Sequence, residues 1–265
     1  MTPYQHVYLS PHLDDAALSC GGMIYAQTKS GERVLIVTIF AGRPDYSRLS
    51  EFARFQHRWW GDPDDPIGQR RREDERACRI LGADWIHLDE LDAIYRCDPA
   101  TGQTLYNSDS EIFGPPHPAD TTKAVTMAEV WLRRLPFSHA RVYAPLAAGS
   151  HVDHQLIRQA AMYLIQYGLS VVFYEDFPYV SDAEKLVQAL AWAIPGGWQA
   201  QQIPLSLDEL ERKKEAISCY VSQTPVIFRH GPSMAEQVVE YARRVGNGQP
   251  AERIWKLISC LERQH

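Results

Sequence analysis

The sequence predicts an α/β protein with a mostly parallel central sheet. Short apolar runs alternate with amphipathic stretches along most of the chain, as expected for repeated strand–helix–strand units. Residues 33–40 are nearly continuous in apolar and β-branched side chains, which is typical of a central parallel strand covered on both faces. The 265 residues are 45% hydrophobic, and no composition shift marks a domain boundary. We therefore expect a single doubly wound domain over residues 1–265, with a C-terminal elaboration from about residue 176.

The individual elements follow from periodicity and from Gly and Pro breakers. Residues 41–67 are too irregular for a single element, and residues 89–118 form a long loop of the kind that is usually functional. A single strand, 198–204, is expected after residue 175. The expected strands are 6–10, 33–40, 85–88, 140–145, 169–174 and 198–204, and the expected helices are 16–30, 69–81, 121–135, 152–167, 181–192, 206–219 and 233–245.

Composition and charge narrow the classes of function. A formal net charge of -6 and a pI near 5.9 argue against nucleic acid or an anionic membrane as the main partner. No apolar run approaches the roughly 18 residues of a membrane span, and the first residues lack a signal-peptide pattern. The five cysteines are widely spaced without a Cys-x-x-Cys pair, which is typical of reduced thiols. We expect a cytoplasmic protein with neither a membrane span nor a nucleic-acid partner.

A cluster of His and Asp residues follows the first expected strand. Residues 10–16 read Ser-Pro-His-Leu-Asp-Asp-Ala and lie where ligands bind in an open α/β sheet, outside the carboxyl ends of the strands. If a helix begins just after Pro11, His12 and Asp15 can face one point with Asp14 beside them. The alternative is that Asp14 or Asp15 only caps the helix.

The same grouping recurs after the expected strand 140–145, as His151, Asp153 and His154. Taken alone, it is more typical of a helix start with an Asp in the first turn and two solvent-facing histidines. Two imidazoles and one carboxylate form a recurrent catalytic zinc shell that leaves a position for water, and the remaining groups can act as base and acid. None of the cysteines lies in either cluster. Together the two clusters predict a metal-dependent hydrolase.

These clusters resemble the motifs of the PIG-L/LmbE-like family of zinc-dependent de-N-acetylases. The family's Pro-His-Pro-Asp-Asp-Glu resembles residues 11–16, and its His-x-Asp-His resembles residues 151–154. Leu13 stands in place of the usual Pro and Ala16 in place of the usual Glu, and neither change removes a metal ligand. The departures are therefore expected to alter the surroundings of the site rather than its chemistry.

The resemblance extends beyond the two motifs. Arg70 and Glu73 match an Arg-x-x-Glu pattern of the family, and the similarity covers roughly residues 5–175. Weaker similarity continues at residues 174–179 and 220–223. The fold that this resemblance implies is a Rossmann-like three-layer sandwich with a mostly parallel central sheet.

The resemblance also implies a role for each site residue. Asp14 would be the general base on the attacking water, and a protonated His151 would stabilise the tetrahedral intermediate or protonate the departing amine. Asp153 would hold an adjacent imidazole in position. Arg70 resembles a substrate-binding arginine, with a solvated charge on the helix face as the alternative. Zn²⁺ is the implied cofactor, Fe²⁺ also suits two histidines and one aspartate, and the implied ligands are His12, Asp15 and His154.

The family mostly acts on N-acetylglucosamine units, which implies a small-molecule sugar or glycoconjugate substrate and compatibility with a homo-oligomer. Aromatic residues within 54–60 could supply ring faces for a sugar, or Trp59 and Trp60 could instead anchor a loop. One alternative is a zinc amidase that acts on another acyl group or a thiol conjugate. Another is a nucleotide-binding module, although no Gly-x-Gly-x-x-Gly follows the first strand.

Overall fold

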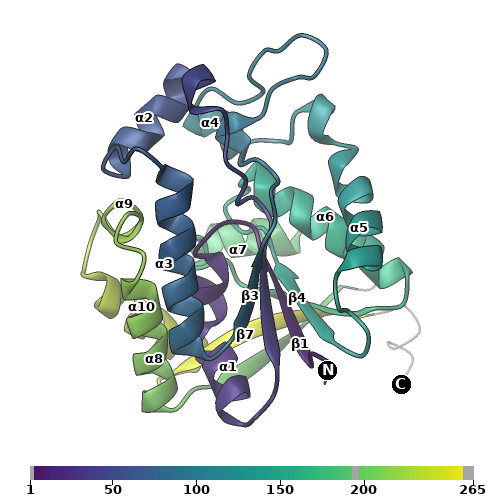
Figure 1. Cartoon of the computed structure of the whole chain (residues 1–265). Helices are drawn as coiled ribbons and strands as arrows, with labels where there is room; N and C mark the ends of the chain where they lie inside the picture. Colours follow the sequence, from purple (N-terminus) through teal and green to yellow (C-terminus); the bar gives the residue numbers. More distant parts are fainter. Residues whose placement is uncertain (1–2, 193–196, 259–265) are drawn as a thin grey trace.

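The computed structural model describes residues 3–192 and 197–258 and shows a three-layer α/β sandwich (Figure 1). The strands of these residues are β1 (His6–Ser10), β2 (Val34–Thr38), β3 (Asp84–His87), β4 (Arg141–Pro145), β5 (Ser170–Tyr174), β6 (Trp198–Pro204) and β7 (Ala251–Leu257). They form one sheet in the order β3-β2-β1-β4-β5-β7-β6. The pairs from β3 to β5 are parallel, and β7 is antiparallel to both of its neighbours. The expected fold class is confirmed.

Helices cover both faces of this sheet (Figure 1). In the described residues they are α1 (Asp15–Lys29), α2 (Glu51–Trp59), α3 (Pro66–Leu81), α4 (Asp109–Ile112), α5 (Lys123–Arg134), α6 (Val152–Gln166), α7 (Ala183–Leu190), α8 (Leu207–Ser218), α9 (Thr224–Ile227) and α10 (Met234–Val245). Helices α1, α3 and α8 lie over Tyr8 and Ile36 on one face. Helices α5 and α6 cover Val7 and Leu9 on the other. Successive side chains of a strand point to opposite faces, so each buried strand contributes to both cores.

Besides the four-residue helices α4 and α9, two longer elements differ from the sequence prediction. Residues 41–67 contain the helix α2, whose first turn is capped by the Ser50 hydroxyl. After residue 175 the described residues contain a second strand, β7, which the sequence analysis does not predict. Its charged residues break the apolar pattern, yet they are paired inside the protein: Glu252 with Lys213 at 2.7 Å, and Arg253 with Glu175 at 2.6 Å.

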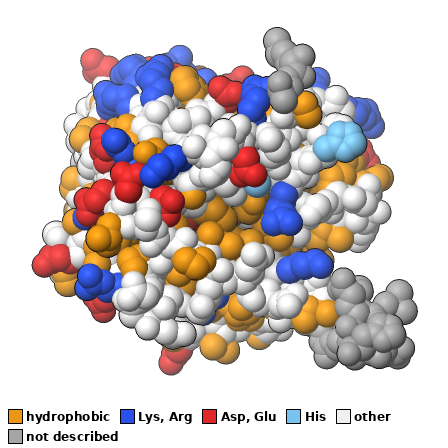
Figure 2. Space-filling model, turned by 90° about the horizontal axis from the view of Figure 1, so that it is seen from below, with side chains coloured by type: hydrophobic (Ala, Val, Ile, Leu, Met, Phe, Trp, Pro, Cys, Tyr) orange, Lys and Arg blue, Asp and Glu red, His pale blue; other side chains and the backbone are white. Residues whose placement is uncertain are grey.

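The face at the amino ends of the strands carries interspersed charges of both signs around apolar side chains (Figure 2). Within the described residues, no helix is long and apolar enough to cross a membrane. Cys20, Cys78, Cys97 and Cys219 are free thiols, and Cys260 lies outside the described residues. The cytoplasmic location stays a prediction.

Candidate active site

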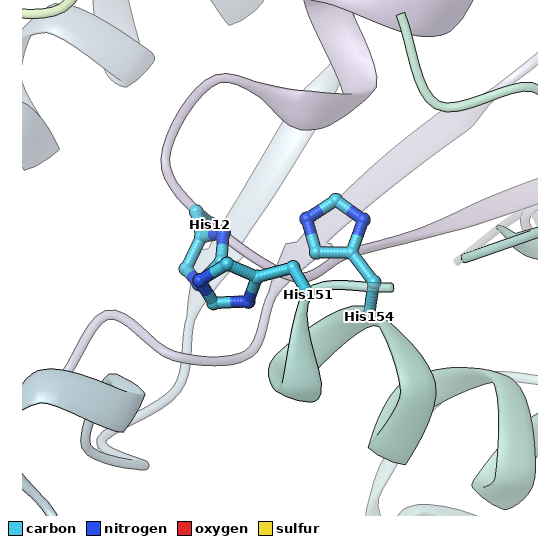
Figure 3. A group of neighbouring side chains, drawn as sticks. All are labelled: His12, His151 and His154. Atoms are coloured by element: carbon cyan, nitrogen blue, oxygen red, sulfur yellow. The ribbon is translucent and has the colours of Figure 1, made fainter. Parts of the chain in front are cut away.

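The two His/Asp clusters meet at the carboxyl edge of the sheet. Strand β1 pairs in parallel with β4, with Tyr8 opposite Tyr143, so the loops that follow both strands begin side by side. His12 comes from the loop after β1, His151 and His154 come from the start of α6, and their rings converge (Figure 3). Three of their nitrogens, one from each ring, lie within 4.8 Å of one another. All three histidines are buried, so the interpretation of solvent-facing histidines is wrong.

The turn between β1 and α1 places two carboxylates next to His12. Helix α1 begins at Asp15 and not just after Pro11, so His12 reaches the site from a turn rather than from a helix face. The His12 amide donates to Asp15 Oδ2 at 2.7 Å, which closes this turn. Asp14 occupies the N-cap position, but its side chain makes no capping hydrogen bond within the described residues. Its carboxylate instead lines the cavity above the sheet, and the interpretation of Asp14 as only a cap is wrong.

The loop between β4 and α6 has an unusual backbone. Ala147, Gly149 and Ser150 all have positive φ, with values of 61°, 86° and 61°. For residues other than glycine this left-handed region carries strain, which is often found at functional sites. A Cβ atom on Gly149 would lie only 2.7 Å from the ring of Tyr179. The sharp turn therefore requires glycine here, and it delivers His151 to the N-cap position of α6.

Asp176 fixes the orientation of His154. Its Oδ1 lies 2.6 Å from His154 Nδ1, and its Oδ2 accepts the Ala148 amide at 2.9 Å. The Nδ1 of His154 is therefore the donor, so the neutral ring has its lone pair on Nε2. Burial lowers the pKa of this ring, but the Asp15 and Asp176 carboxylates raise it to about 9. This Nε2 atom is buried without a hydrogen-bond partner among the described residues, and it lies 3.3 Å from Asp15 Oδ2. A buried, unpartnered imidazole nitrogen that faces a carboxylate suits a metal ligand.

Asp153 holds His12 in the complementary way. His12 Nε2 lies 2.9 Å from Asp153 Oδ2, so its Nδ1 keeps the lone pair. That Nδ1 atom lies 3.2 Å from Asp15 Oδ2. Asp153 also accepts the Ala93 amide at 3.0 Å and the buried guanidinium of Arg96. This is the contact with an adjacent imidazole that the sequence analysis expects of Asp153.

His151 differs from the other two imidazoles. Its Nδ1 accepts the Asp153 amide at 3.2 Å, so the neutral ring carries its proton on Nε2. Burial and the neighbouring His12 lower the pKa of His151 well below its ordinary value. This low pKa favours the neutral ring at rest, and the protonated His151 that the resemblance implies at the tetrahedral intermediate stays a prediction. The neutral ring still presents an N–H donor through Nε2.

The donor atoms fit a small divalent ion. Two atoms bound to one tetrahedral zinc at about 2.0–2.2 Å lie about 3.3–3.6 Å apart. Asp15 Oδ2 lies at 3.2 Å from His12 Nδ1 and at 3.3 Å from His154 Nε2, close to this spacing. Asp15 is in neither of the two groups of described residues whose donor atoms all lie within 4.8 Å of one another. The first of these is His12 with His151 and His154, and the second is His12 with Asp92 and Asp153. Its Asp153 carboxylate, however, is already occupied by three hydrogen bonds.

The two adjacent carboxylates have opposite electrostatics. Burial and the Asp15 carboxylate raise the pKa of Asp14 to about 7, although the nearby Arg70 opposes the shift. Burial would also raise the pKa of Asp15, but His154 and His12 hold it well below its ordinary value. Asp15 is thus a permanent anion, whereas Asp14 can exchange a proton near neutrality.

Arg70 points into the protein from α3. The residue is 5% exposed, its guanidinium lies 4.9 Å from the centre of the Trp60 ring, and its Nη2 lies 3.6 Å from Asp14 Oδ2. Its Nε is buried without a hydrogen-bond partner among the described residues. The interpretation of Arg70 as a solvated charge is therefore wrong, and the residue forms part of the cavity wall.

Three charged residues of this site were missing from the sequence analysis. Asp92 and Arg96 lie within residues 89–118, the loop predicted to be functional, but neither residue stood out there. Asp176 follows β5, within the weaker similarity at residues 174–179. Asp176 could have been found from its position directly after another expected parallel strand. The carboxyl ends of parallel strands share one edge of the sheet, so an acidic residue there lies near the two clusters.

The fold and the site together define a class: α/β proteins with a candidate metal-dependent hydrolase centre at the carboxyl edge of a parallel sheet. A family model described as PIG-L, GlcNAc-PI de-N-acetylase, matches residues 7–165, and the chain belongs to this family.

Similar proteins are deacetylases by name. A 2'-N-acetylparomamine deacetylase from Niallia circulans is 30% identical over 234 residues, which cover 84% of this chain and 82% of that protein. The crystal structure of teicoplanin deacetylase Orf2 in a zinc-inhibited form has a TM-score of 0.78 at 26% identity, covering 94% of this chain and 96% of that one. A40926 pseudoaglycone deacetylase Dbv21 has a TM-score of 0.75 at 26% identity, covering 97% and 98%.

Proposed function

We propose that the protein is a metal-dependent N-deacetylase that removes the acetyl group from an N-acetylglucosamine-type sugar or glycoconjugate. One observation carries this proposal: His12 Nδ1 and His154 Nε2 lie at ligand spacing around Asp15 Oδ2, with Asp14 beside them. Relatives named as deacetylases of acetylated antibiotics support the same reaction. Water would add to the acetamide carbonyl, and the C–N bond would break to give acetate and a free amine.

His12, Asp15 and His154 would hold Zn²⁺ or Fe²⁺. When bound, such an ion lowers the pKa of water toward neutrality and polarises a carbonyl group. The protein orients the two histidine ligands through hydrogen bonds to the ring nitrogen that would not bind the metal. Asp153 fixes His12, and Asp176 fixes His154.

Two other side chains would move protons and stabilise charge. The Asp14 carboxylate takes a proton from the attacking water and then returns it to the departing amine nitrogen, so one group serves both steps. The Nε2–H of His151 donates to the carbonyl oxygen as negative charge develops on it. Because the resting His151 is neutral, it is better suited to this donor role than to protonation of the amine.

The cavity supports a sugar-sized substrate. Its volume of about 470 Å³ lies within the usual range of small-molecule sites. Arg70 lines this cavity and would contact the sugar through its guanidinium group. A nucleotide is disfavoured, because Asp14 and Asp15 stand at the start of α1, where a phosphate would need to bind. Localisation, oligomeric state and the single-domain organisation remain predictions.

The test is acetate release from N-acetylglucosamine and its glycosides by zinc-loaded and iron-loaded protein. We expect the parent to release acetate and Asp14→Asn to keep its metal while losing about 10³-fold in turnover. His154→Ala should instead lose metal, as measured by elemental analysis. Full turnover by Asp14→Asn would show that the assigned base is wrong. Release of a longer acyl group in preference to acetate would favour the amidase alternative.

A further inference from the structure

The outer half of the cavity is lined mainly by aromatic and aliphatic side chains. Above the buried histidines, the wall is formed by α2, α4 and α9, which lie together at one end of the molecule (Figure 1). We call this wall the aromatic rim, and define it by Phe55, Trp59, Ile112, Phe113, Ile227 and Arg229. None of these residues has a part in the proposed chemistry.

The two faces of helix α2 differ: one face anchors the helix to the protein, and the other faces the cavity. Its inner face holds Ala53 and the buried His57, whose Nε2 lies 2.6 Å from the Tyr95 hydroxyl. Trp60 packs against the His57 ring with centroids 5.3 Å apart and lies under Arg70. Trp60 is thus an anchor, as one interpretation of residues 54–60 expects. These contacts hold α2 in place without the residues on its other face.

Phe55 and Trp59 stand on the opposite face of α2, one helical turn apart. They are 42% and 47% exposed, and their ring centroids lie 6.1 Å apart. Both line the cavity. Large apolar side chains that are this exposed at a cavity wall are characteristic of ligand contact.

The charges of the aromatic rim favour a particular kind of ligand. The guanidinium of Arg229 lies 5.3 Å from the centre of the Trp59 ring. That of Arg58, which is not among the cavity-lining residues, lies 5.6 Å from the centre of the Phe55 ring on the same helix. Arginines stacked on aromatic rings attract flat π-systems and anions. They repel ammonium groups. The one acidic side chain among the residues that line this wall, Asp109, lies within hydrogen-bond distance of Gln56, at 3.4 Å.

We propose that the aromatic rim binds an aromatic aglycone, uncharged or acidic, attached to the acetylated sugar. This inference rests on the proposed function and specifies its substrate class. Flat stacking surfaces favour a rigid ring over a flexible acyl chain. The positive charge of Arg229 disfavours a substrate that carries free amines, such as the 2'-N-acetylparomamine in the name of the Niallia circulans relative.

The experiment compares acetate or acyl release from four compounds: N-acetylglucosamine, its p-nitrophenyl β-glycoside, 2'-N-acetylparomamine and N-octanoylglucosamine. We expect the aryl glycoside to have the highest kcat/KM, about tenfold above the free sugar. Trp59→Ala should lower the ratio of the aryl glycoside to the free sugar by about tenfold. The matched control Tyr167→Ala removes an aromatic ring that is 61% exposed at the far end of α6, and should leave that ratio unchanged.

A charge reversal tests the second part of the proposal. Arg229→Glu should raise kcat/KM for 2'-N-acetylparomamine several-fold and lower it for the aryl glycoside. A parent enzyme that prefers the paromamine or octanoyl compound would overturn the inference, as would an aryl preference that Trp59→Ala leaves intact.

Equilibrium binding separates this inference from the proposed function. Calorimetry with the Asp14→Asn variant measures binding of the aryl glycoside without turnover. Binding that weakens about tenfold on adding Trp59→Ala supports the aglycone site even if the parent releases no acetate, in which case only the proposed function fails. If the parent releases acetate but Trp59→Ala leaves binding of the aryl glycoside unchanged, the aglycone site is refuted and the proposed function stands.

Discussion

The inner and outer halves of the cavity are built in opposite ways. In the inner half, His12 and His154 each have one nitrogen fixed by a carboxylate and the other turned toward Asp15. In the outer half, Phe55 and Trp59 are nearly half exposed on a helix that is anchored by other residues. We therefore expect substitutions in the inner half to reduce stability, metal binding and catalytic activity together. Substitutions in the outer half should change selectivity alone.

The largest effect on stability is expected at Arg96, the cation beneath the inner half. Its guanidinium binds Asp153 and lies 2.7 Å from Asp120, and the residue is 4% exposed. Arg96→Met leaves two buried carboxylates without their cation and should lower the free energy of unfolding by about 3–5 kcal/mol. Urea denaturation measures this change. Arg79→Met, at an exposed pair with Glu75, should change it by less than about 1 kcal/mol, and equal losses would contradict the contrast.

The next effect concerns the carboxylate that orients His154. Asp176→Asn weakens the contact at Nδ1 and should reduce metal affinity by about 10–100-fold. Competition with a chelator measures this change. Asp208→Asn, at an exposed pair with Lys29, serves as the control and should bind metal as the parent does. Unchanged affinity in Asp176→Asn would show that the imidazole is oriented without Asp176.

The pH dependence of the reaction tests the pair of Asp14 and Arg70. Because Asp14 must lose its proton to act as a base and its pKa is raised to about 7, kcat/KM should rise with pH through that value. Arg70 lowers the pKa of Asp14, so Arg70→Gln should move this acid limb upward by about 1 pH unit. Arg71→Gln, whose parent side chain pairs with Asp89, should leave the limb in place. If Arg70→Gln leaves the acid limb in place, the limb reports the titration of a group other than Asp14.

The smallest effect is expected in the outer half. Trp59→Ala and Phe55→Ala remove rings that are nearly half exposed, so each should change the free energy of unfolding by about 0.5 kcal/mol or less. Thermal or urea unfolding provides the measurement. A loss of several kcal/mol at Trp59 would mean that this ring anchors α2, and the contrast between the two halves would fail.

The sequence predicts the parts of the site that local patterns encode. His12, Asp14 and Asp15 follow one apolar run, and His151 to His154 follow another, so parallel pairing brings them to one edge. The protonation state of each imidazole is not encoded locally. It depends on contacts such as that of His154 with Asp176, 22 residues away, and that of Arg96 with Asp153, 57 residues away.

Elements were missed for a related reason. Strand β7 carries Glu252 and Arg253, which look like surface charges until their buried partners are known. Helix α2 covers only nine residues, and the Pro- and Gly-containing stretches on either side of it within residues 41–67 hide so short a helical period. Local pattern fails where a tertiary partner or a ligand decides the environment.

The Glu252 carboxylate has a consequence for the order in which the chain matures. It accepts the amides of Gly22 and Met23 at 3.0 Å and 2.8 Å, and so braces the helix whose first turn carries Asp14 and Asp15. The contact with Gly22 spans 230 residues, and β7 lies between β5 and β6. During synthesis on the ribosome, the segment that carries both carboxylates emerges before β7, and it gains this support only after the 230 residues that separate Gly22 from Glu252 have been made.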